Sequence, residues 1–200
     1  MRRGRFSVAR VLLPLALAAV LIALGAQPGA AQERPGTLSL GIQGQFGLIA
    51  GASDFAELYD NGAGFAFRIR YALGGPQAIG ISFENQTFTP DNSQLEGTRD
   101  DPRELSFANA SVEYLRYFNR GQGQSQYVVA GVGFYHPSDE RVQGVAPASD
   151  GLILLFGGGA EIFFLRATSI DVSVRANAFL GDAISTTLEA AVGLHHYLVN

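Results

Sequence analysis

The chain has 200 residues, of which 18 are acidic and 14 are basic, and it contains no cysteine. The length suits a single domain, and the acidic balance argues against a nucleic-acid partner, which would need a basic face. The lack of cysteine excludes thiol catalysis and Cys-based metal sites, and we expect neither a cofactor nor a bound metal.

The chain begins with the features of a secretory signal. An apolar run, Val11–Leu24, follows a basic segment that contains Arg2, Arg3, Arg5 and Arg10, and small residues follow at Gly29, Ala30 and Ala31. The run is shorter than the roughly 20 residues that a membrane-spanning helix needs. We therefore predict a cleaved signal peptide over residues 1–31 and one domain over residues 32–200.

Alternation of apolar and polar residues, which marks a strand with two different faces, recurs eight times in that domain. The predicted strands are Leu38–Leu48, Phe65–Leu73, Ile79–Glu84, Leu105–Asn119, Tyr127–His136, Leu152–Leu165, Ile170–Ala178 and Thr187–Leu194. The short connections lie at 74–77, 120–125, 166–169 and 180–183. The longer, polar connections lie at 50–63, 89–104 and 137–150. Short periplasmic turns and longer outer loops are typical of outer membrane barrels.

Three of these strands need a further argument for which side faces inward. In the fourth strand Glu113 lies mid-strand, so Val112 and Tyr114 should face outward. The fifth strand is apolar on both sides; we place Gly131 and Gly133 inward, and the outward set is Val128, Ala130, Val132 and Phe134. In the sixth strand, the outward set on the face opposite Glu161 is Phe156, Ala160, Ile162 and Phe164.

The charges separate a membrane barrel from a secreted, soluble one. One face of the strands carries the charges Arg68, Arg70, Glu84, Glu113, Glu161, Asp171, Arg175 and Glu189. A soluble barrel would turn that face to water, whereas a lipid-facing arginine at mid-bilayer costs about 2–4 kcal/mol, so a membrane barrel turns it inward. Arg116 is outward but near a strand end, where it can reach the interface. The incomplete aromatic girdle would consist of Tyr71, Tyr114, Tyr117, Phe118 and Tyr135.

We therefore predict an all-β fold, an eight-stranded antiparallel up-and-down transmembrane β-barrel, with its inward charges as the site of interest. Since an unpaired buried charge is costly, the three inward arginines should form ion pairs with the five carboxylates. Eight strands enclose an interior that side chains can just fill, which favours a closed, polar lumen. A narrow pore or a carrier of small hydrophobic ligands is the alternative.

Two glycine-spaced segments carry a family resemblance. Val129–Tyr135 (VAGVGFY) and Phe156–Glu161 (FGGGAE), together with the signal and the eight alternating strands, resemble the OmpA/OmpX-type outer membrane β-barrel domain family. The resemblance implies a non-enzymatic monomer in the bacterial outer membrane that acts in envelope integrity or surface interaction. Its partners would be outer membrane lipids, lipopolysaccharide and the barrel assembly machinery.

A second resemblance concerns Phe134–Ser138, whose sequence FYHPS is similar to the F-x-H-x-S core of the lipid A deacylase barrels. In those enzymes a histidine activates a serine against an ester, so His136 and Ser138 would be catalytic here, with Glu140 as the acidic third member. Pro137 indicates that the strand has already ended. We favour a chance pair of loop residues, and a lipid A ester hydrolase is the alternative.

Two further patterns suggest a metal site at first sight. His195 and His196 are adjacent on a strand and so should point to opposite faces, one to the rim and one to the lumen. The segment 91–104 is rich in charge, but its carboxylates lack the spacing of a calcium loop. We therefore interpret that segment as a solvated loop.

Overall fold

The computed structural model describes residues 35–50, 59–90, 104–118, 123–139, 150–180 and 185–198. The predicted signal peptide and nearly all of the charged segment 91–104 lie outside these ranges. Within the described ranges, no helix is long and apolar enough to cross a membrane.

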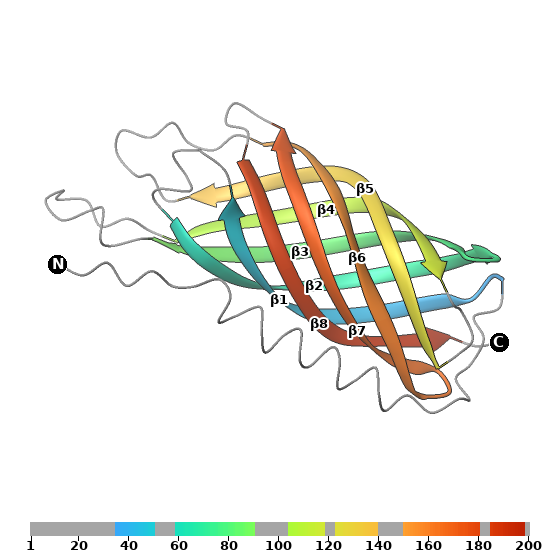
Figure 1. Ribbon diagram of the computed structural model, residues 1–200. Coiled ribbons are helices and arrows are strands. Elements are labelled where there is room, and N and C mark those ends of the chain that lie inside the picture. The colour runs from blue at the N-terminus through green and yellow to red at the C-terminus, as the bar shows by residue number, and fades with distance from the viewer. Residues whose placement is uncertain are drawn as a thin grey trace, which may run out of the picture.

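Eight antiparallel strands form one closed barrel, in which each strand pairs with its neighbours in the chain and the first strand pairs with the last (Figure 1). The strands are β1 (Leu38–Ala50), β2 (Tyr59–Gly74), β3 (Gln77–Pro90), β4 (Leu105–Phe118), β5 (Gln124–Asp139), β6 (Gly151–Leu165), β7 (Thr168–Leu180) and β8 (Ser185–Leu198). The register of β1 on β8 runs from Leu38 opposite Leu198 to Ala50 opposite Thr186. The predicted fold class is confirmed.

The two ends of the barrel differ in their connections. β2 and β3 are joined through Gly75 and Pro76, and Gly74 and Gly75 have φ angles of 111° and 56°, which L side chains rarely adopt. A turn at Arg166 and Ala167 joins β6 to β7. We call this the short-turn end. The opposite end, from which the longer connections leave after β1, β3 and β5, is the long-loop end.

Several strands are longer than the sequence predicted. β2 begins at Tyr59 and not at Phe65, and β3 continues beyond Glu84 to Pro90. In both strands the backbone pairing continues through glycine and polar residues, where the sequence shows no clear alternation of apolar and polar side chains. One such pair is Gly64 opposite Gln86. The loops at the long-loop end are correspondingly shorter than expected.

β5 also continues beyond its predicted end at His136, so the expectation that Pro137 ends the strand is wrong. Pro137 lies opposite Phe107 of β4. Among the described residues the pairing of β5 with β6 stops at Tyr135, so there the last part of β5 pairs with β4 alone. Proline is tolerated in such an edge segment, and Ser138 therefore belongs to a strand.

The period of two places most side chains on the predicted face. Val112, Phe134 and Phe156 are 59%, 71% and 65% exposed, whereas Glu113 and Glu161 are buried. The outward set chosen for β5 is exposed throughout. The face assignments of β4, β5 and β6 are therefore confirmed.

Two aromatic residues predicted for the girdle lie inside the barrel instead. Tyr117 and Tyr135 are 2% and 6% exposed. Each shares its strand parity with an inward residue, Tyr117 with Glu113 and Tyr135 with Gly133, so the alternation directs both rings into the lumen. The girdle residues that do face outward are Tyr71, Tyr114 and Phe118.

Glycine allows adjacent strands to approach closely at positions such as Gly133 and Gly193. A Cβ atom at Gly133 of β5 would lie 2.1 Å from the carbonyl oxygen of Ala110, and one at Gly193 of β8 would lie 2.0 Å from the carbonyl oxygen of Ile42. Neither position could hold a larger side chain without moving backbone. The close approach of the strands at these positions therefore requires glycine.

Candidate functional site

The lumen contains all eight charged residues that the sequence analysis placed there, each at most 6% exposed. Along β7 the inward residues run from Asp171 near the short-turn end through Arg175 and Asn177 to Phe179 near the long-loop end. The same order on the other strands divides the lumen into four parts. These are a short-turn ionic layer, a central ionic layer, a polar layer and an aromatic cluster.

The central ionic layer consists of Gln43, Arg68, Ser82, Glu84, Glu113 and Arg175. Arg175 donates from Nη1 and Nη2 to the two carboxylate oxygens of Glu113, at 2.5 and 3.2 Å. Arg68 donates from Nη2 to Glu84 at 3.0 Å and from Nη1 to the side-chain oxygen of Gln43. Nη1 of Arg175 lies 3.5 Å from Oε1 of Glu84. Two arginines and two carboxylates thus form one balanced network.

The short-turn ionic layer consists of Arg70, Tyr117, Tyr127, Glu161, Asp171, His195 and Tyr197. Arg70 forms ion pairs with Glu161 and, at 2.9 Å, with Asp171. One guanidinium faces two carboxylates here, so other donors are needed. The Tyr117 hydroxyl donates to Glu161 at 2.9 Å and the Tyr127 hydroxyl donates to Asp171 at 3.0 Å. The hydroxyl of Tyr197 also donates to Glu161.

These contacts cross the lumen from wall to wall. Arg70 of β2 reaches carboxylates on β6 and β7, and Arg175 of β7 reaches carboxylates on β3 and β4. Removing one partner of a buried pair typically costs about 3–5 kcal/mol, because the other charge is left uncompensated. The two ionic layers therefore join opposite walls at two levels.

The polar layer consists of Gln45, Gln86, Asn177, Thr187 and Glu189. The expectation that every inward carboxylate pairs with an arginine is wrong here, because Glu189 forms no ion pair with any residue that the structure describes. The Thr187 hydroxyl donates to Oε1 of Glu189 at 3.3 Å. In the amide orientation that satisfies both of its atoms, Gln86 donates to the same oxygen at 2.8 Å and accepts from the backbone of Gly47 at 3.0 Å.

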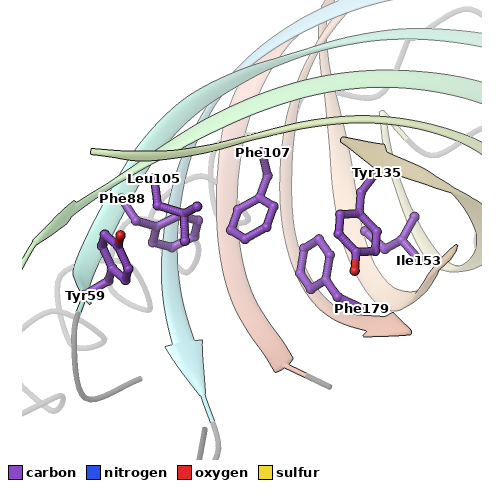
Figure 2. Packing of buried hydrophobic residues seen from close by; sticks show 7 residues of the cluster. All are labelled: Tyr59, Phe88, Leu105, Phe107, Tyr135, Ile153 and Phe179. Carbon is purple, nitrogen blue, oxygen red and sulfur yellow. The ribbon is translucent and has the colours of Figure 1, made fainter. Parts of the chain in front are cut away.

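An aromatic cluster lies inside the barrel at the long-loop end (Figure 2). It consists of Tyr59, Phe88, Leu105, Phe107, Tyr135, Ile153 and Phe179. The ring centroid of Phe107 lies 5.9 Å from that of Phe88, 6.1 Å from that of Tyr135 and 5.0 Å from that of Phe179. The sequence analysis missed this cluster, although the strand parity that Phe88 shares with Glu84 could have placed it inside.

A second candidate site lies on the outside of the barrel near the long-loop end. Nδ1 of His136 lies 2.5 Å from Oδ1 of Asp150, and the two side chains are 71% and 74% exposed. Ser138 is exposed on the same face of β5 as His136. The predicted third member, Glu140, lies outside the described residues, and the carboxylate that contacts the ring is Asp150.

The two C-terminal histidines point to opposite faces, as predicted. His195 is fully buried, with Nε2 3.8 Å from Oδ2 of Asp171, whereas His196 is exposed. Among the residues that the structure describes, no group of three His, Cys, Asp or Glu side chains could hold a metal ion.

No protein-family model matches the chain, and no curated protein matches it by sequence. Solved structures match it over nearly their whole length. The outer membrane protein OprG from Pseudomonas aeruginosa has a TM-score of 0.60 at 12% identity, with 86% of this chain and 100% of that chain covered. The Neisserial surface protein A has a TM-score of 0.59 at 12% identity, with 80% and 98% covered. Ail, the attachment invasion locus protein of Yersinia pestis, has a TM-score of 0.54 at 19% identity, with 82% and 99% covered.

This chain has the fold of the OmpA/OmpX-type outer membrane β-barrels. In such a barrel the outward band of apolar side chains faces lipid. Among the described outward positions of the strands, Arg116 is the one Arg, Asp or Glu side chain, and it lies near the short-turn end of β4. A closed sheet, a largely apolar exterior and inward charges suit a β-structure that crosses a bilayer.

Proposed function

We propose that the protein is a non-enzymatic, integral protein of the bacterial outer membrane that acts in envelope integrity or surface interaction. The observation that carries this proposal is the set of ion pairs that cross the lumen in two layers, together with a cluster of buried aromatic and aliphatic residues at one end. An eight-stranded barrel has an interior that side chains can fill. A lumen filled in this way leaves the exterior and the loops as the working surfaces.

The apolar exterior of the barrel and the position of its longer loops support the proposed contacts with membrane lipids and lipopolysaccharide. The apolar band would contact outer membrane lipids, and the long-loop end would face the cell surface and lipopolysaccharide, since outer membrane barrels place their longer loops outside. One structural neighbour is named an attachment invasion locus protein, which supports a role in surface contact. We propose a monomer that the barrel assembly machinery inserts.

Two measurements test this proposal. Protein from an outer membrane fraction should migrate differently on a gel before and after boiling, because a closed barrel stays folded in detergent until it is heated. Planar bilayers that contain the folded protein should show no channel openings. Migration unchanged by boiling, with the protein in the soluble periplasmic fraction, would contradict the membrane location, and steady conductance would favour the pore.

A second candidate function, lipid A ester hydrolysis, is favoured by one observation, the contact between His136 and Asp150. A carboxylate at Nδ1 orients the imidazole and leaves Nε2 to take a proton. Ser138 lies two positions along the same face of β5, where its hydroxyl could attack an ester carbonyl while His136 takes the hydroxyl proton and returns it to the departing alcohol. Water would then release the acid from the serine.

Serine variants on two adjacent strands separate the two functions. Ser138→Ala removes the candidate nucleophile, whereas Ser106→Ala, at the position opposite it on β4, is the matched control. If the protein is a hydrolase, lipid A from cells with the wild type or Ser106→Ala lacks an acyl chain that cells with Ser138→Ala retain, as mass spectrometry would show. Identical lipid A in all three strains would remove the enzyme.

A further inference from the structure

One chain of hydrogen bonds joins the two ionic layers of the lumen. Nη1 of Arg68, in the central ionic layer, donates to the side-chain oxygen of Gln43. The amide nitrogen of Gln43 lies 3.4 Å from Nε2 of His195, which belongs to the short-turn ionic layer. All three residues are at most 1% exposed, so this chain is shielded from solvent.

The arginine sets the direction of the chain. A guanidinium only donates and does not lose its proton in proteins, so the oxygen of the Gln43 amide must face Arg68. The amide nitrogen, which also only donates, therefore faces His195. Nε2 of His195 must then be the acceptor, and an imidazole that accepts is neutral and carries its proton on Nδ1.

The wall of the barrel leaves room for the imidazole ring at this point. A Cβ atom at Gly41 of β1 would lie 2.4 Å from Nε2 and from Cε1 of His195, so a larger residue there would displace the ring. Nδ1 of His195 has no hydrogen-bond partner in the described part of the protein. Nε2 is therefore the nitrogen through which the ring is bonded.

The charges around the ring are mostly positive. They belong to Arg68 and Arg70 of β2 and to Asp171 and Arg175 of β7, and among the described residues β1 contributes none. Oδ2 of Asp171 lies 3.8 Å from Nε2 of His195, beyond hydrogen-bond distance, and already forms an ion pair with Arg70 at 2.9 Å. Three guanidinium groups and one engaged carboxylate oppose a further positive charge on the ring.

We propose that His195 is an acid-sensitive link between the two ionic layers. A proton on Nε2 would place two donors opposite each other, and turning the Gln43 amide to relieve this would direct its nitrogen at Arg68. Either arrangement leaves a buried donor without an acceptor, which is costly. The link therefore holds while His195 is neutral and breaks when the ring takes up a proton, so the barrel is less stable in acid.

The proposal is tested by urea titration of the whole folded barrel in detergent at about pH 8 and about pH 5.5, at constant ionic strength. An unfolded histidine binds a proton near pH 6.5. Because His195 stays neutral in the folded barrel, the folded state binds fewer protons than the unfolded state at the lower pH, and stability falls as the pH falls. The folding equilibrium should drop about tenfold more in the wild type than in His195→Gln, whose side-chain oxygen can accept from Gln43 but does not titrate.

Two further variants show whether the link itself is responsible. His196→Gln changes the exposed neighbouring histidine and should lose as much stability in acid as the wild type. Gln43→Glu supplies a carboxylate that accepts both from Arg68 and from a protonated His195, so the extra loss in acid should disappear even if His195→Gln fails to fold. Equal losses in the wild type and in either His195→Gln or Gln43→Glu would overturn the proposal. A smaller loss in the wild type than in His195→Gln would also overturn it, because His195 would then be charged in the folded barrel and paired with Asp171.

Discussion

The two ends of the lumen differ in chemistry, although the same alternation places both sets of side chains inside. Both ends contain buried apolar side chains, and the ion pairs lie toward the short-turn end. Toward the short-turn end, Arg70 binds two carboxylates that tyrosine hydroxyls also bind. At the long-loop end, aromatic rings such as Phe107 pack against one another. The ionic layers depend on complete, directional pairing, whereas the aromatic cluster depends on shape and area. The interior of this small barrel therefore combines two kinds of contact, one after the other along its axis.

The largest effect is expected where a charge partner is removed from the ionic half. Arg175→Met leaves Glu113 without its bidentate partner, so the free energy of unfolding should fall by about 3–5 kcal/mol. Urea titration of the folded barrel in detergent measures this loss. The double variant with Glu113→Gln should recover part of it, and a loss below about 1 kcal/mol in the single variant would show that the pairing is not what stabilises this half.

The aromatic half should respond to lost volume. Phe107→Ala removes a ring that packs against three others and should lower the free energy of unfolding by about 3 kcal/mol. Phe134→Ala, which removes a ring that is 71% exposed on the outside, is the control and should cost clearly less in detergent. Planar bilayers with Phe107→Ala should stay silent, because the ionic layers still fill the lumen. Channel openings in this variant would mean that the aromatic cluster alone closes it.

A single hydroxyl should matter less than a guanidinium or a ring. Tyr197→Phe removes one donor to Glu161 and keeps the packing of the ring against Phe163. Hydrogen bonds to charged groups contribute about 1.5–3 kcal/mol, so the loss should fall at the lower end of this range. Tyr114→Phe on the exposed face of β4 gives the baseline for the same urea titration, and equal values for both variants would contradict the role of the hydroxyl.

The smallest effect belongs to the exterior. Val192 is 55% exposed on the outside of β8, and Val192→Leu keeps an apolar surface, so stability should change by less than about 0.5 kcal/mol. The change in the free energy of unfolding for this variant is the baseline for the variants in the two halves of the lumen. A loss as large as that of Tyr197→Phe would indicate that the outside of β8 packs against something.

The fold was predictable because charge and alternation agree along the chain. Glu113 and Glu161 were enough to orient strands whose apolar residues alone were ambiguous, since a carboxylate at mid-strand has one tolerable side. Tyr117 and Tyr135 were assigned to the girdle because aromatic residues suit an interface as well as an interior. Their position in the alternation, and not their residue type, determines that both rings lie inside the barrel.

The sequence does not show which side chains contact one another within each site. The contact of His136 with Asp150 joins residues 14 positions apart and depends on the register of β5 on β6. The separation of Glu189 from Arg175 has a similar origin: the two lie opposite each other in the β-ladder, but the direction of the long arginine side chain is set by carboxylates on β3 and β4. Register and side-chain direction are three-dimensional properties, and alternation carries neither.

The ion pairs of Arg70 constrain the order in which the barrel can assemble. Arg70 is on β2, whereas its partners Glu161 and Asp171 are on β6 and β7. The guanidinium therefore has no counter-charge until most of the strands have been added to the sheet. A half-finished sheet in lipid would expose both this cation and unpaired backbone groups. Insertion and closure must therefore proceed together, and a chain truncated before β6 should stay outside the bilayer.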